Sequence, residues 1–103
     1  MKFTGIFAII ILINAILGGI KVMKVSIGNI LKNMRNINTN LSQKEIGDVL
    51  TVAHNTISSY ERENSQPDFQ TIIDYAEACD FEIKIINKRT NEEVSLEELS
   101  KEL

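Results

Sequence analysis

The stretch "LSQKEIGDVLTVAHNTISSYERE", residues 41–63, predicts two short helices joined by a tight turn. Ser42 stands where a helix N-cap would be, and Glu45, three residues later, completes the pattern of a capping box. We therefore expect a helix from residue 42 or 43 to residue 50. After the turn "TV", the segment "HNTISSYERE" predicts a second short helix with Ile57 and Tyr60 turned inward.

The spacing inside this stretch is specific. Counting Gln43 as position one, a small residue, Gly47, stands at position five, where it would let the second helix cross close to the first. Apolar residues that would bury the seam stand at positions four, eight, ten, fifteen and eighteen: Ile46, Leu50, Val52, Ile57 and Tyr60.

Two further helices flank this pair. Before it, apolar residues recur at helical spacing from Ile27 onward, and this helix should end in the polar turn "NINTN". After it, Pro67 interrupts the chain, and "DFQTIIDYAEAC" predicts a helix over residues 68–79. The residues expected on its inward face are Phe69, Ile72, Ile73, Ala76 and Cys79.

The period changes after residue 80. In "FEIKIIN", residues 81–87, apolar and polar residues alternate, which predicts a strand. A lone strand leaves its hydrogen bonds unmet, so either "VSLEEL" folds back as a hairpin or the same strand of a second subunit pairs with it. "VSLEELSKEL" also has the pattern of a short acidic helix capped by Ser95 with Glu98.

Charge is distributed unevenly along the chain. The formal net charge is −3, but the segment from Lys24 to Arg62 carries five bases and three acids. From Glu63 onward eleven acids face four bases. This asymmetry indicates one surface for a polyanion and another kept away from it. The single cysteine, Cys79, excludes an intramolecular disulfide and a cysteine-based zinc site.

The spacing resembles the helix-turn-helix of the lambda-repressor/Cro-type family, often called the XRE family. The resemblance covers residues 27–79 and includes "LSQKEIGDVL" and "TISSYERENSQPDF", with a proline six residues after a glutamate. It implies a mainly α fold with a four-helix DNA-binding domain in residues 24–80. A strand and a short acidic helix in residues 81–103 would serve dimerisation or partner binding.

Three residues depart from the family pattern. Thr51 stands at the turn position where the family usually has Gly, so we expect a left-handed backbone at some cost. Ala53 replaces the usual capping Ser or Thr of the second helix, which would lose about 1 kcal/mol. Glu63 occupies the place of a common Gly after that helix. These departures predict a less stable or slightly reshaped motif, not a different fold.

The resemblance also implies roles for individual residues. Arg35 and Glu61 match a structural ion pair of the family if the "NINTN" loop carries one extra residue. The residues that would contact base edges are His54, Asn55 and Ser59. The residues that would contact or lie near phosphates are Gln43, Thr56, Ser58, Arg62 and Asn64.

The function that the resemblance implies is sequence-specific binding of double-stranded DNA by a cytoplasmic transcriptional regulator, a repressor on a palindromic operator. We expect a homodimer, because a two-fold dimer presents two recognition helices about one DNA turn apart. The placement of the strand resembles the branch with HipB-like antitoxins. An antitoxin that binds its own promoter and a toxin protein is therefore an alternative, as is a membrane-anchored regulator.

The sequence argues against an enzyme. The one histidine, His54, lies on the expected DNA-facing helix, and no Gly-rich phosphate loop is present. The acids have neither metal-ligand spacing nor the spacing of an acid/base pair. We expect no cofactor and no metal.

Residues 1–22 differ from the rest of the chain. Residues 3–20 are uncharged, which is near the lower limit for a membrane span, and Lys21 with Lys24 would favour a cytoplasmic C-terminal side. The string "LGGIKVM" has another explanation, since adjacent glycine codons can contain a ribosome-binding purine run at a suitable distance before Met23. We hypothesise that Met23 is the natural start and that residues 1–22 are a translated leader.

Overall fold

The computed structural model describes residue 9 and residues 24–102. Of residues 1–22, only residue 9 is described. The two expectations for this segment, a translated leader or an apolar membrane helix, therefore lie outside the described residues. In the part of the chain that is described, no helix combines the length and the apolar character that crossing a bilayer requires.

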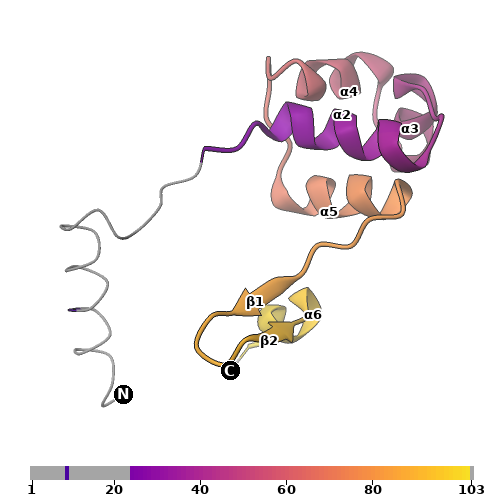
Figure 1. Cartoon of the computed structure of the whole chain (residues 1–103). Coiled ribbons are helices and arrows are strands. Elements are labelled where there is room, and N and C mark those ends of the chain that lie inside the picture. Colours follow the sequence, from indigo (N-terminus) through magenta and orange to yellow (C-terminus); the bar gives the residue numbers. More distant parts are fainter. Residues whose placement is uncertain (1–8, 10–23, 103) are drawn as a thin grey trace.

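Five helices and one two-stranded sheet form the described residues (Figure 1). In chain order they are α2 (Ile27–Asn38), α3 (Gln43–Leu50), α4 (His54–Glu61), α5 (Phe69–Ala78), β1 (Ile85–Asn87), β2 (Glu92–Val94) and α6 (Leu96–Ser100). Helices α2 to α5 pack together as a bundle, and the β1–β2 hairpin with α6 lies beyond α5. The expected four-helix domain, followed by a strand and a short acidic helix, is confirmed.

Side-chain caps explain where most helices begin. Ser26, Ser42, Asp68 and Ser95 each accept a hydrogen bond from the backbone N–H three residues later. At α3 the Glu45 carboxylate also accepts from the Ser42 N–H at 3.1 Å, which completes the capping box. The predicted helix from residue 43 to residue 50 is therefore confirmed.

The hydrophobic core lies between α2, α3, α4 and α5. Its fully or nearly buried members are Leu31, Met34, Ile46, Ile57, Tyr75, Ala76 and Cys79. Burial also raises the pKa of the Cys79 thiol, because the thiolate would lose its solvation there. These residues come from all four helices, so the bundle is held together by one shared core.

The turn between α3 and α4 is tight. Thr51 ends α3 with φ 58° and ψ 44°, the left-handed backbone expected at this position. Beyond it the Val52 N–H donates to the Gly47 carbonyl at 2.8 Å, which folds the chain back over α3. A Cβ atom at position 47 would lie 2.5 Å from the Val52 carbonyl oxygen, so this turn requires glycine at Gly47.

Two boundary expectations and one burial expectation differ from the structure. Helix α2 runs through Asn38, so it includes the first three residues of the expected turn "NINTN". Helix α5 begins at Phe69, after its Asp68 cap, and Pro67 lies outside it. Phe69 is 55% exposed rather than inward, because the buried face of α5 is centred on Tyr75 and Cys79 and leaves Phe69 at its flank.

The strand expected over residues 81–87 is shorter than predicted. Only Ile85–Asn87 pair, antiparallel to Glu92–Val94, with Ile85 opposite Val94. Residues 81–84 form no ladder; Phe81 and Ile83 are half-buried against the core instead. The structure shows a hairpin within one chain, but its returning strand is Glu92–Val94. The segment "VSLEEL", residues 94–99, contributes only Val94 to that strand, because Ser95 caps α6 and the chain turns helical from Leu96.

Candidate DNA interface

One side of α4 is turned away from the core. Asn55, Ser59 and Arg62 follow one another at spacings of four and three residues, so they share a stripe opposite the buried Ile57. His54 and Asn55 in the first turn are exposed. Ala53 makes no side-chain hydrogen bond to the first N–H groups of α4, as expected from its departure from the family pattern.

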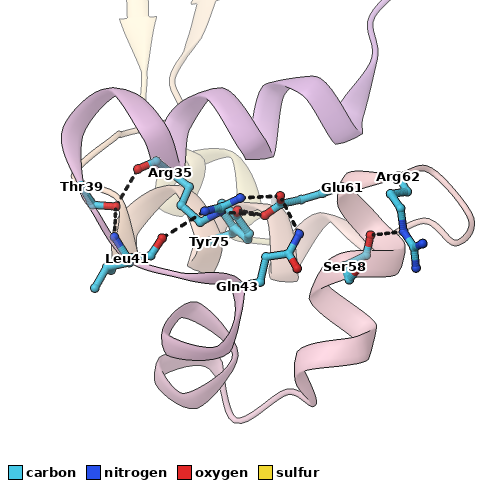
Figure 2. A network of polar contacts seen from close by, with 8 residues as sticks. All are labelled: Arg35, Thr39, Leu41, Gln43, Ser58, Glu61, Arg62 and Tyr75. Carbon is cyan, nitrogen blue, oxygen red and sulfur yellow. Dashed lines mark hydrogen bonds and ion pairs between the residues drawn. The ribbon is translucent and has the colours of Figure 1, made fainter.

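The other candidate residues of α4 are less accessible. Thr56, Ser58 and Ser59 are half-buried, and the Ser59 hydroxyl lies 2.8 Å from the hydroxyl of Ser65. After the helix, Arg62 and Asn64 are exposed. The Arg62 Nε donates a long hydrogen bond, 3.4 Å, to the Ser58 carbonyl, which leaves the rest of its guanidinium pointing outward (Figure 2).

Glu61, the last residue of α4, carries a buried carboxylate (Figure 2). Arg35 of α2 binds it with two parallel hydrogen bonds, Nε to Oε2 at 3.0 Å and Nη2 to Oε1 at 2.8 Å. This is the ion pair that the resemblance implied, in the bidentate geometry that favours Arg over Lys. A third nitrogen of Arg35 donates to the Leu41 carbonyl at 3.1 Å, which fixes the loop before α3.

Two neutral side chains complete the shell around Glu61. The Tyr75 hydroxyl of α5 donates to Oε2 at 2.6 Å, and the Gln43 amide of α3 donates to Oε1 at 3.2 Å. Burial alone would raise the pKa of Glu61, but the hydrogen bonds from Arg35, Tyr75 and Gln43 together hold that pKa below its usual range. The pKa of the Tyr75 phenol is raised by burial and by the neighbouring carboxylate. We refer to Arg35, Gln43, Glu61 and Tyr75 as the Glu61 network.

The Glu61 network fixes the orientation of Gln43. An ionised carboxylate only accepts hydrogen bonds, so the NH₂ end of the amide must face it. Gln43 is half-buried at the first position of α3, and its NH₂ group has a second proton beyond the one given to Glu61. The candidate phosphate contact therefore has a donor that the core holds in place.

The loop after α4 is fastened to the start of α2. The Glu63 carboxylate accepts from the Ser26 hydroxyl at 2.5 Å and from the Gly28 N–H at 3.1 Å. These two hydrogen bonds lower the pKa of Glu63. Glu63 has φ 62°, which agrees with its place at a position where the family often has glycine.

The fold thus combines four packed helices, a tight turn with a left-handed residue, and a polar stripe on the outer side of the second helix of the pair. A family model described as helix-turn-helix matches residues 31–86, somewhat more than half of the chain. The chain belongs to the XRE-type helix-turn-helix family. The comparisons with curated proteins and with solved structures gave no match.

Membership in the helix-turn-helix family makes the protein a DNA-binding transcription regulator. In such motifs the second helix of the pair enters the major groove while the first crosses the backbone. Here these helices are α4 and α3.

Three structural roles were not predicted from the sequence. No sequence pattern indicated Tyr75 as a hydrogen-bond donor to Glu61. Glu63 was noted only for its backbone, although its side chain binds the start of α2. Gly28 also fits closely, since a Cβ there would lie 2.4 Å from the Glu61 carbonyl oxygen. Each role joins elements far apart in the chain, and no local pattern marks it.

Proposed function

We propose that this regulator is a cytoplasmic repressor that binds a palindromic operator as a homodimer. The observation that carries the proposal is the polar stripe of Asn55, Ser59 and Arg62 on the outer side of α4 and its C-cap, in a chain of the helix-turn-helix family. A protein bound over a promoter excludes other proteins from it, which is the simplest route from such a domain to regulation. We assign DNA binding to residues 24–80.

His54, Asn55 and Ser59 would read the bases. Asn55 can form two hydrogen bonds with adenine, and neutral His54 can donate or accept at a purine edge. Ser59 is half-buried and bonded to Ser65, so its contact requires the hydroxyl to rotate. This makes Asn55 the residue on which we expect specificity to depend most.

Phosphate contacts would set the register of the protein on DNA. The residues proposed for them are Gln43, Thr56, Ser58, Arg62 and Asn64. Gln43 and Arg62 are the strongest members, because one carries a donor oriented by Glu61 and the other carries a full charge with an outward guanidinium. Thr56 and Ser58 are half-buried and would contribute less.

A homodimer would place two α4 helices about one DNA turn apart. The sheet of the described residues contains only β1 and β2, so each strand has one edge without a partner there. Ile85 and Ile86 on β1 are 42% and 56% exposed, which is a high exposure for isoleucine. The outer edge of β1 is therefore our candidate for two-fold pairing.

An antitoxin is the second candidate function. The segment from Glu63 onward, with eleven acids and four bases, carries a charge opposite to that of a DNA-binding surface. The hairpin and α6 form a separate unit beyond α5 (Figure 1). In this function residues 24–80 bind the protein's own promoter while residues 81–103 bind a toxin. Co-purification with the product of a neighbouring gene would distinguish it from a plain repressor.

DNA binding is tested with the purified chain and DNA selected from a random pool. We expect enrichment of a palindromic sequence and an affinity that falls steeply as salt rises, since bound phosphates release counterions. Sedimentation of the complex should give two chains per site. If no sequence is enriched at low salt, the proposed function is wrong.

The residue roles are tested by two variants on the selected site. Asn55→Ala should relax the preference at one base position, at a cost of about 1–3 kcal/mol on the cognate base. Arg62→Ala should weaken all sequences alike and reduce the salt slope by about one. Lys101→Ala removes the same charge at the far end of the chain and should change neither. Indistinguishable behaviour of Asn55→Ala and Arg62→Ala would show that the groove assignment is wrong.

A further inference from the structure

Two adjoining hollows lie between α5 and the C-terminal unit. The first hollow has a volume of about 500 Å³, and its apolar lining includes Phe69, Ile73, Ile85 and Leu99. The second hollow has a volume of about 400 Å³, and its apolar lining includes Ile73, Phe81 and Ile83. Leu96 of α6 lines both, so the hollows form one groove on either side of its side chain. We refer to it as the α5–α6 groove.

Three large apolar side chains that line the α5–α6 groove are left exposed by the described chain. Phe69 and Leu99 are each 55% exposed, and Ile85 is 42% exposed. The core cluster of the bundle does not include these three residues. Large apolar side chains gathered around one groove, rather than scattered singly, are typical of a protein-binding surface.

The rim of the groove is acidic. Glu77, Glu82 and Glu97 line it, and no lysine or arginine does. Among the ion pairs of residues 24–102, none includes Glu77 or Glu97. An occupant with lysine or arginine beside its apolar side chains would therefore gain contacts that the chain itself does not supply.

Charge also argues against a second copy of this chain as the occupant. Two copies of this groove facing each other would bring the carboxylates of Glu77, Glu82 and Glu97 close to the same carboxylates of the second copy. A groove of this shape accepts the apolar ridge of an amphipathic helix, whose side chains recur at spacings of three and four residues. Figure 1 shows α6 and the hairpin on the side of α5 opposite to α4, so such a helix would leave the candidate DNA surface free.

We infer that the α5–α6 groove binds an amphipathic helix of a basic partner protein, with Leu96 at its centre and Glu77, Glu82 and Glu97 holding the basic flank. This inference gives the antitoxin-type function a surface and a partner chemistry. The inference rests on the antitoxin-type function in one respect, the existence of a protein partner. It does not depend on any DNA contact.

The test uses the full chain and a synthetic 14-residue peptide of leucine and lysine in amphipathic helical order. We expect binding by fluorescence anisotropy, with at least tenfold loss in Leu96→Glu. Phe69→Ala, at an exposed position outside the core, should weaken binding several-fold without risk to the fold. Ile37→Glu adds the same charge at a 70% exposed apolar residue that does not line the groove, and it should bind like the wild type.

Matched peptides separate the groove from plain charge attraction. A scrambled peptide of the same composition keeps its charge but has no apolar face, and a leucine and glutamate peptide keeps the face with the opposite charge. We expect both to bind at least tenfold more weakly. The Glu77→Gln, Glu97→Gln double variant should reduce the salt dependence of binding. Equal binding of the scrambled peptide, or no loss in Leu96→Glu, would overturn the inference.

Sedimentation of the free chain tests the other occupant. If Leu96→Glu converts a dimer to a monomer, the groove is a contact between copies and the inference is wrong. The selected operator then separates the two proposals. Wild-type chain that binds the peptide but no DNA would refute only the proposed function, whereas operator binding without peptide binding would refute only this inference.

Discussion

Thr51 and Glu63 both hold a left-handed backbone, with φ 58° and 62°. Glycine adopts this conformation without steric cost, whereas a residue with a Cβ loses about 1–2 kcal/mol. The two residues differ in what their side chains provide. Glu63 binds Ser26 and Gly28, whereas the side chain of Thr51 makes no hydrogen bond within the described residues. Strain at Glu63 is thus offset by a contact, and strain at Thr51 is not.

Thr51→Gly should therefore raise the free energy of unfolding by about 1 kcal/mol, as measured by urea denaturation. Glu63→Gly is the matched control, because it relieves the same strain but removes two hydrogen bonds to the start of α2. We expect Glu63→Gly to give no gain. An equal gain in both variants would mean that the Glu63 contacts contribute nothing to stability.

At the scale of elements, one glycine lies where the turn to α4 folds back on α3, and another lies where α2 meets the end of α4. Gly47 of α3 faces the Val52 carbonyl, and Gly28 of α2 faces the Glu61 carbonyl, where a Cβ atom would lie 2.5 Å and 2.4 Å away. Both neighbours are backbone atoms, which cannot rotate out of the way. The orientation of α4, and with it the polar stripe, depends on these two contacts.

Gly47→Ala should destabilise the fold by roughly 1–3 kcal/mol, because the added methyl group clashes with the Val52 carbonyl in the turn between α3 and α4. Without a steric clash, alanine would stabilise the helix by about 1 kcal/mol relative to glycine. A decrease in the free energy of unfolding therefore identifies the steric effect. Thermal unfolding of this variant is compared with that of Asn33→Ala, an exposed position of α2. Asn33→Ala should be neutral or slightly stabilising. A stabilised Gly47→Ala would contradict the close crossing.

At the scale of the whole molecule, the Glu61 network ties α2, α3, α4 and α5 to one carboxylate. The pKa of Glu61 is lower in the folded chain than its ordinary value of 4.5. The stability that this shift contributes is fully present above about pH 4.5 and is lost as the pH falls through the folded pKa. Glu63 and Asp68, whose pKa values are also lowered, act in the same direction.

Glu61→Gln should lower the free energy of unfolding by roughly 3–5 kcal/mol at pH 7, because the variant leaves the half-buried Arg35 charge without its partner. Urea denaturation between pH 7 and pH 3 should show the difference from the wild type shrinking as the wild-type carboxylate becomes protonated. Asp48→Asn, which breaks the exposed pair with Lys44, should cost less than about 1 kcal/mol. A constant difference at all pH values would show that Glu61 does not titrate as assigned.

Much of the fold could be predicted because its signals are local. The capping box at Ser42 and Glu45 marks the start of α3, and the apolar spacing from Ile46 to Tyr60 defines the helix pair. Thr51 was expected to be left-handed from its place in the motif, and it is. The pairing of residues 81–84 was predicted wrongly, since alternation alone does not show whether a neighbouring strand exists.

The sequence by itself determined the family, the four helices of the DNA-binding domain and the candidate residues of α4, since these depend on periodicity, caps and turn chemistry within a few residues. Only the tertiary structure decided which side chains surround Glu61, what Glu63 binds and where the α5–α6 groove lies. Gln43 and Tyr75 meet Glu61 from elements 18 and 14 residues away. Contacts at such separations depend on how helices pack, and packing is set by the whole core rather than by any single segment.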